Sequence, residues 1–428
     1  MPSFLAGTAR VDITPPAGLD MTGFIARLGP ATGTHDPLWA RAFVVEQDGT
    51  ALALVAADIL GFDRHSTAAI RRIVHRRVGR PIDVMLAATH THSGPATLFL
   101  RHCGTVDAAW MKALHARVAD AVCTAYSRLT GARVSIGSGE ATIGINRRVA
   151  GGPTDPSVAV LRVETTDGRP LGAVVNYACH PVVLGSDSRL WSADFPAAAN
   201  AALEQRYGAG YDGFLSLFIN GAAGDINPRE RDTFEVADRL GTELADAATG
   251  AWDRATAVEV TALRGASRTV TLPLSPPPSL DEAHDLLSEY GDKYETLKQE
   301  GGSEVAIKVA GAMASWAAEL YKRLRDGTVP SSIDAEFQAF GLGPVRFIAV
   351  PGELFSAIGL AIKQACQGLN VFVVGYGNED IGYLPTRQAF QQGGYEVADA
   401  HRYYDLLPVT PETENIVIEA AVGLINSL

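Results

Sequence analysis

The stretch Val84-Met85-Leu86-Ala87-Ala88-Thr89-His90 is an apolar run that stops abruptly at two polar residues. A run this short and this apolar is typical of a strand that is buried on both faces of a sheet. Helical stretches often follow such runs in this chain. The sequence therefore predicts an α/β fold with a mixed, largely buried sheet flanked by helices. The pattern recurs, with polar or turn residues directly after each run, at residues 52–57, 173–178, 214–219, 347–350 and 371–374.

The composition sets limits on the class of protein. The chain has 428 residues, of which 47% are hydrophobic and 20% charged, so it can bury enough apolar surface to fold. Its formal net charge of −12 argues against nucleic acid as a partner, because phosphate binding needs a basic face. The chain contains no apolar run long enough to predict a transmembrane segment.

The cysteines and the first residues bear on the cellular compartment. Cys103, Cys123, Cys179 and Cys366 form no C-x-x-C pair and are far too sparse for a disulfide scaffold, so we expect reduced thiols. No basic segment followed by an apolar one is present near Met1, as a secretory signal would require. We therefore predict a cytoplasmic location.

The segment 276–328 has a different character from the rest of the chain. It begins with three consecutive prolines, and Ser279 and Glu282 then form a capping box that starts a helix. A glycine pair interrupts the helical spacing, and we expect a second helix over 304–325. Because the strand pattern returns at 333–340, we interpret 276–328 as a helical hairpin inserted into the α/β body. It either covers the active site or only pads the fold.

The strongest local motif is His90-Thr91-His92, directly after the run 84–88. Two histidines at positions i and i+2 of an extended segment point to the same side. Both imidazoles could bind one metal ion, or one could bind it while the other supports it. The alternative is a pair of hydrogen-bonded turn histidines, and the motif alone does not decide between these interpretations.

Two further residues at strand ends are candidate ligands. His180 stands in a Cys-His-Pro sequence after an apolar run, and Glu353 follows another run and a Pro-Gly turn. Each also has an ordinary structural interpretation. His180 could be a hydrogen-bonded structural histidine, and Glu353 could be a carboxylate at a helix N-terminus. Two histidines and a carboxylate, however, are a common catalytic zinc set that leaves room for water. Zinc in such a site lowers the pKa of water and polarises a carbonyl group.

The segment 220–228, with the sequence NGAAGDINP, is the fourth motif. Its small residues permit a tight loop whose backbone amides approach a ligand, and the alternative is a plain connection. The sequence has no G-x-S-x-G, H-E-x-x-H or P-loop motif, so those three catalytic classes are not supported.

Taken in order, these motifs resemble those of the neutral/alkaline ceramidase family. The likeness runs through nearly the whole chain, and the ordered set is far more specific than any one motif. The other matching stretches are residues 7–15, His35, residues 40–44, Ile145-Asn146-Arg147, Gly224-Asp225, residues 383–386 and Tyr395-Glu396.

The resemblance implies one zinc ion per chain, bound by His90, His180, Glu353 and Tyr383. Tyrosine is an unusual zinc ligand, and nothing in the residues themselves selects Tyr383. Without the resemblance it would be interpreted as a buried aromatic residue with one satisfied hydroxyl group.

The resemblance also implies the residues that act on the substrate. His92 would transfer the proton, while Arg147 and Tyr395 would stabilise the developing oxyanion. Asn227 departs from the family, which has serine at this position of its G-D-x-S-P motif. If that serine were the nucleophile, this chain would be inactive. If zinc-activated water attacks, as we favour, Asn227 can still hold the substrate by hydrogen bonds, with a preference for a different head group.

We therefore predict a zinc-dependent hydrolase of a carboxamide (N-acyl) or related acyl bond, with a small-molecule or lipid-like amide as its substrate. The alternatives are a lactone or ester hydrolase, a catalytically inactive protein that binds a metal or ligand, and a metal-free α/β protein. Ceramidases carry an immunoglobulin-like domain after the catalytic one. Because the sequence ends at Leu428, we expect residues 1–428 to be a single catalytic domain without it, and a soluble amide to be at least as good a candidate as a membrane sphingolipid.

Overall fold

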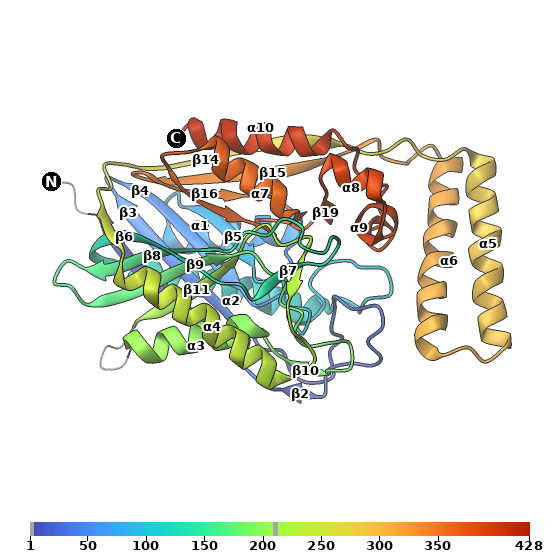
Figure 1. Ribbon diagram of the computed structural model, residues 1–428, viewed down its shortest axis with the longest axis horizontal. Helices are drawn as coiled ribbons and strands as arrows, with labels where there is room; N and C mark the ends of the chain where they lie inside the picture. The colour runs from blue at the N-terminus through green and yellow to red at the C-terminus, as the bar shows by residue number, and fades with distance from the viewer. Residues whose placement is uncertain (1–3, 209–212) are drawn as a thin grey trace.

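The structure is a computed structural model that describes residues 4–208 and 213–428. Its largest element is a nine-stranded sheet with the order β11-β9-β8-β6-β1-β3-β4-β5, to which β13 is added by pairing with β6 (Figure 1). Most neighbours are antiparallel, whereas β4–β5 and β9–β11 are parallel. The strands are β1 (Leu5–Asp12), β3 (Trp39–Gln47), β4 (Thr50–Ala57), β5 (Asp83–Ala88), β6 (Thr130–Glu140), β8 (Ser157–Thr165), β9 (Pro170–Tyr177), β11 (Leu215–Asn220) and β13 (Thr256–Val258).

A four-stranded sheet, with the order β14-β15-β16-β18, packs against one face of the large sheet. Large apolar side chains from both sheets meet there, including Phe43, Leu54 and Phe340. Three two-stranded pairs complete the β-structure of the described residues. Their strands are β14 (Leu263–Pro273), β15 (Ser332–Leu342), β16 (Val345–Ala349) and β18 (Asn370–Val374), with the pairs β2 (Gly33–Thr34) and β10 (Leu190–Trp191), β7 (Gly144–Asn146) and β12 (Ile226–Pro228), and β17 (Glu353–Leu354) and β19 (Tyr383–Leu384).

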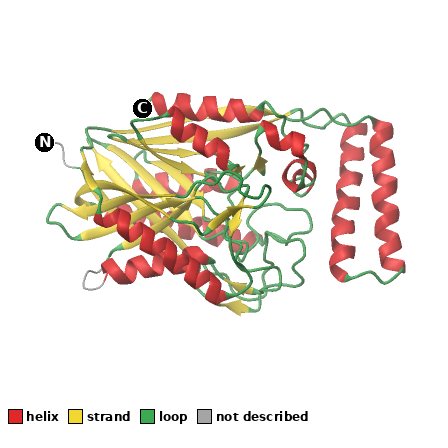
Figure 2. Ribbon diagram, viewed as in Figure 1, coloured by secondary structure: helices red, strands yellow, loops and turns green. Residues whose placement is uncertain are grey.

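Helices cover the outer faces of both sheets (Figure 2). The large sheet is covered by α1 and α2 at one part and by α3 and α4 at the other. The small sheet is covered by α7 and α10. This layering confirms the predicted mixed α/β fold. The helices are α1 (Arg64–Val78), α2 (Ala108–Ser127), α3 (Phe195–Gly208), α4 (Phe234–Asp253), α7 (Ser356–Ala365), α8 (Arg387–Gln392), α9 (Tyr395–Ala398), the 3₁₀ turn η1 (Ala400–Arg402) and α10 (Thr413–Asn426).

The curvature of the large sheet brings its two ends together. Although β11 and β5 are the first and last strands in the order, β11 contacts β3, β4 and β5. The Nδ2 of Asn220, at the end of β11, donates a hydrogen bond to the carbonyl oxygen of Thr89, just after β5, at 3.2 Å. The loops that follow β5 and β9 therefore meet, although about 90 residues separate them along the chain.

Two adjacent helices, α5 (Leu280–Gln299) and α6 (Glu304–Arg325), occupy the segment 276–328, and Ser279 with Glu282 forms the capping box that the sequence predicts. They lie at one end of the molecule (Figure 1). On α6, Met313 packs into a cluster with Leu60 and Tyr403, so the hairpin supports residues near the predicted site. None of the helices in the described ranges has the length and apolarity needed to span a bilayer.

Candidate active site

Four strand ends bring the predicted metal ligands together. His90 follows β5 and His180 follows β9, the two strands whose loops converge. Glu353 begins β17 and Tyr383 begins β19, and the two residues are direct partners in this short parallel pair. The residues that the resemblance implies as ligands therefore come from four separate segments that the fold places side by side.

Hydrogen bonds to the backbone orient both histidine rings. The Nδ1 of His90 lies 2.7 Å from the carbonyl oxygen of Leu60, and the Nδ1 of His180 lies 2.7 Å from that of Ala223. A carbonyl oxygen only accepts, so each Nδ1 carries a proton, and each Nε2 is the ring nitrogen that faces the carboxylate of Glu353. The Nε2 atoms of His180 and His90 lie 3.0 Å and 3.4 Å from the same Oε2 of Glu353. This is the arrangement expected of imidazoles prepared to bind a metal.

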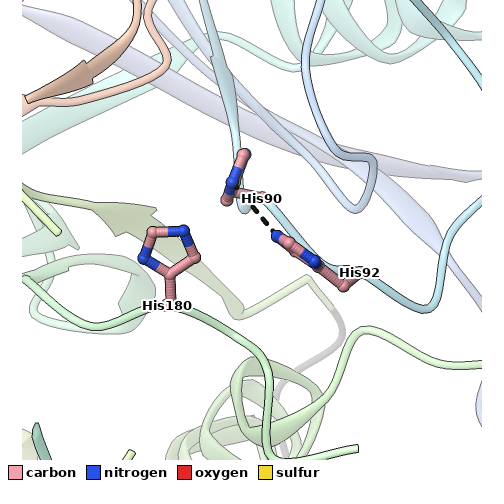
Figure 3. A group of neighbouring side chains, drawn as sticks. All are labelled: His90, His92 and His180. Atoms are coloured by element: carbon pink, nitrogen blue, oxygen red, sulfur yellow. Dashed lines mark hydrogen bonds between the residues drawn. The ribbon is translucent and has the colours of Figure 1, made fainter. Parts of the chain in front are cut away.

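His92 joins this group from the other side of His90. The Nε2 atoms of His92 and His90 lie 3.3 Å apart, and the ring nitrogens of His90, His92 and His180 all lie within 4.8 Å of one another. Figure 3 shows the three rings gathered around a common point. His90 itself has a φ of 69°, a left-handed conformation that is strained for any residue except glycine.

The charge states of the group suit a divalent cation. Burial lowers the pKa of His180 to about 4, so its imidazole is neutral at pH 7. Burial alone would raise the pKa of Glu353, but His90 and His180 beside it bring that pKa well below its usual value. Buried imidazole and carboxylate side chains are a donor set that fits zinc.

Two tyrosines that the sequence analysis did not select support these ligands. The hydroxyl group of Tyr404 donates to the Oε1 of Glu353 at 2.9 Å, which leaves Oε2 facing the histidines. The ring of Tyr376 stacks on His90, with ring centroids 3.9 Å apart. Tyr376 stands two residues after the predicted strand 371–374, which could have marked it, whereas Tyr404 lies in a turn without any pattern.

The loop over residues 220–228 forms hydrogen bonds to the segments that carry the predicted ligands. The side chain of Asn220 accepts a hydrogen bond from the backbone N–H of Cys179 at 3.2 Å while it donates to Thr89, so it connects the two histidine loops. Ala223 supplies the carbonyl oxygen that orients His180. The backbone N–H of Gly224 donates to the carbonyl oxygen of Leu354 at 2.8 Å. The described contacts thus give this loop a supporting function.

We predict that Gly224→Ala weakens zinc binding by about 10-fold or more, the loss typical when groups that support a metal ligand are disturbed. A Cβ atom at this position would clash with the backbone carbonyl oxygen of Glu353, a predicted ligand, so Glu353 must shift. Competition with a fluorescent chelator measures the affinity. The matched control is Gly423→Ala on α10, where a Cβ meets nothing within 4 Å. Equal affinities of the two variants would contradict the supporting function of Gly224.

The side chain of Arg147 donates hydrogen bonds to three residues beside the cavity. Its Nε donates to Glu396 at 2.9 Å, its Nη2 to the hydroxyl oxygen of Tyr383 at 3.0 Å, and its Nη1 to the Oδ1 of Asn227 at 3.3 Å. Burial would lower the pKa of Arg147, but Tyr383 and Glu396 raise it above the usual value, so the guanidinium group stays charged. Arg147 was predicted from the sequence to act on the substrate, whereas no function was predicted for Glu396, which accepts its hydrogen bond.

A cavity of about 260 Å³ opens beside these residues. Seven of the eight residues selected from the sequence line it, and the eighth, His180, contacts Glu353 from behind the cavity wall. The aromatic ring of Tyr395 is about half exposed at this cavity. The fold thus brings all eight residues to one place, and their individual functions remain predictions. The seven are His90, His92, Arg147, Asn227, Glu353, Tyr383 and Tyr395.

Residues 4–238, more than half of the chain, match the family described as "Neutral/alkaline non-lysosomal ceramidase, N-terminal". The chain belongs to this family. The match confirms the resemblance that the sequence motifs indicate.

The relatives of this ceramidase-family chain include named ceramidases. It is 28% identical to the neutral ceramidase of Pseudomonas aeruginosa over 246 residues, which cover 52% of this chain and 36% of that protein. It is 25% identical to the neutral ceramidase of Drosophila melanogaster over 311 residues, which cover 58% of this chain and 44% of that protein. The matched part therefore spans less than half the length of these two relatives.

Solved structures show the same fold. The crystal structure of the neutral ceramidase from Pseudomonas aeruginosa superposes on the whole of this ceramidase-family chain and on 75% of its own chain, with a TM-score of 0.77 and 21% identity. A structure described as ceramidase complexed with C2 gives a TM-score of 0.77 at 20% identity. At this level of identity the likeness concerns the fold alone.

Proposed function

We propose that this ceramidase-family protein is a zinc-dependent hydrolase of linear carboxamides of the N-acyl type. The observation that carries the proposal is the meeting of the Nε2 atoms of His90 and His180 with the Oε2 of Glu353 beside an open cavity. The names of the relatives support an amide as the substrate class. We assign the metal to His90, His180, Glu353 and Tyr383, and zinc bound there would polarise the acyl carbonyl group and lower the pKa of a water molecule.

The other residues act on the proton and on the developing charge. We assign proton transfer to His92, whose Nε2 faces the centre of the site, 3.3 Å from that of His90. In the reaction the oxygen of water forms a bond to the acyl carbon, the C–N bond breaks, and the amine nitrogen receives the proton. Arg147 and Tyr395 line the same cavity and would donate hydrogen bonds to the carbonyl oxygen as it becomes negative.

The presence of Asn227 favours a mechanism in which water, and not a side chain of the protein, attacks the acyl carbon. It occupies the place of the family serine, its amide group is not a nucleophile, and its Oδ1 accepts a hydrogen bond from Arg147. The same substitution is the observation that supports the alternative function, a protein that binds metal and ligand without turnover.

A substrate panel separates these functions. Zinc-loaded protein is incubated with N-acyl amides, esters and lactones that share one acyl chain, and released acid is measured by mass spectrometry. We expect the amides to be hydrolysed and His90→Ala to abolish the hydrolysis. Preference for esters or lactones would replace the amidase assignment, and bound zinc without turnover of any substrate would support the inactive binding protein.

A further inference from the structure

The mouth of the cavity carries an arginine that the proposed reaction does not use. Arg231 lines the cavity together with Asn227, in the turn that follows β12. Its Nε donates to the carbonyl oxygen of Val182 at 2.8 Å, and the next backbone N–H, that of Asp232, donates to Val183 at 2.7 Å. These bonds fix the turn to the segment that follows His180, so the guanidinium group has a set position relative to the site.

The charge of Arg231 is not balanced by a neighbour. Within residues 4–208 and 213–428, no carboxylate lies within 4.0 Å of its guanidinium nitrogens, and neither Nη atom has a hydrogen-bond partner. The other arginine of the cavity, Arg147, is paired with Glu396. Glu230, the residue before Arg231, is engaged with Arg229 and Arg239. Arg231 therefore presents two free donor groups and a positive charge at the cavity mouth.

The side-chain amide of Asn227 adds a second hydrogen-bond donor to the cavity, its Nδ2 group. Because a guanidinium group only donates, the amide oxygen of Asn227 faces Arg147, and its Nδ2 group is directed elsewhere. A serine hydroxyl can both donate to and accept from a hydroxyl-bearing head group, whereas this amide nitrogen only donates. The two side chains together match an acceptor-only, negatively charged group, for which a carboxylate is the simplest partner.

Part of the cavity lining is apolar. Leu60, Leu100, Cys103 and Tyr403 line it and belong to one buried cluster with Met313 of α6. This apolar part of the lining suits an acyl chain, which leaves the donor groups of Arg231 and Asn227 for the amine half of the substrate.

We propose that the amine half of the substrate carries a carboxylate, so that the substrate class is N-acyl amino acids, and that Arg231 with Asn227 determines this specificity. The proposal rests on the proposed amidase function. It assigns Arg231 to recognition of the head group and to no step of bond cleavage.

The test compares two amides that differ at one group, N-decanoylglycine and N-decanoylethanolamine. We expect the wild-type protein to prefer the glycine conjugate and Arg231→Gln to lower kcat/KM for that conjugate by about 10- to 100-fold, mainly through KM, as for the loss of a charge-assisted hydrogen bond. The ethanolamine conjugate should change by less than about 3-fold, because it lacks the charge. Arg169→Gln, an exposed arginine outside the cavity that pairs with Asp167, removes the same charge and serves as the control.

A binding measurement makes the outcome independent of turnover. Titration calorimetry with zinc-free protein should show tighter binding of N-decanoylglycine than of N-decanoylethanolamine, and Arg231→Gln should remove the difference. Hydrolysis of both amides with no preference, unchanged in Arg231→Gln, would overturn the carboxylate specificity and leave the amidase function standing. A retained binding preference without any hydrolysis would support the specificity and refute the amidase function.

Discussion

Replacing His180 by alanine is expected to lower the zinc content from about one ion per chain to less than about 0.1 and to remove measurable hydrolysis. His180 is completely buried, its Nδ1 is held by the carbonyl oxygen of Ala223, and its Nε2 faces Glu353 at 3.0 Å. Alanine removes one of the proposed ligands and leaves the carboxylate of Glu353 buried without that neighbour. Metal analysis by mass spectrometry after dialysis against zinc gives the content, and the substrate panel gives the activity.

The control for this experiment is His284→Ala. His284 is exposed on α5 and lies outside the cavity, so its loss should change neither zinc content nor turnover. Circular dichroism of His180→Ala tests whether the fold persists, which we expect because apolar clusters on both sheets hold it. A folded His180→Ala protein that keeps a full complement of zinc would show that the metal binds elsewhere, and the proposed centre would have to be abandoned.

The strands could be predicted from the sequence because a strand that is buried on both faces appears as a short, continuous run of apolar residues. The apolar runs at 52–57, 84–88 and 371–374 correspond to β4, β5 and β18. The curvature that brings β11 against β5 has no such signature, because it results from how the sheet packs on its second layer. Only the structure therefore explains why His90 and His180 meet.

Some residues of the candidate site could likewise be predicted from the sequence, and others could not. Histidines and a carboxylate at strand ends can be identified without coordinates, because few other residue types bind zinc. Tyr383 was selected only through the family resemblance, and its pairing with Glu353 across β17 and β19 supplies the physical reason for its position. Tyr404 was missed, and Glu396 was named only as part of a matching stretch, without a function. Each acts on a functional residue through one hydrogen bond from a distant segment, and a single sequence contains no trace of such a contact.

Replacing Arg147 by methionine is expected to reduce kcat by about 100- to 1,000-fold, the loss typical when a donor to a developing oxyanion is removed. The side chain lines the cavity beside Tyr383, its charge is maintained by Glu396, and methionine fills similar volume without any donor. Because Arg147 is not among the four proposed ligands, the zinc content should remain near one ion per chain. Stopped-time assays at saturating amide, together with metal analysis of the same sample, measure both quantities.

Two further variants serve as comparisons for Arg147→Met. Arg147→Lys keeps the charge but cannot reach Glu396, Tyr383 and Asn227 at once as the planar guanidinium group does, so it should recover only part of the lost kcat. Arg133→Met removes an exposed arginine from β6 and should leave kcat unchanged. If Arg147→Met lost its zinc as well, Arg147 would be a residue that positions Tyr383 for the metal. Loss of kcat with the zinc retained would support a function of the Arg147 charge in turnover that is separate from metal binding.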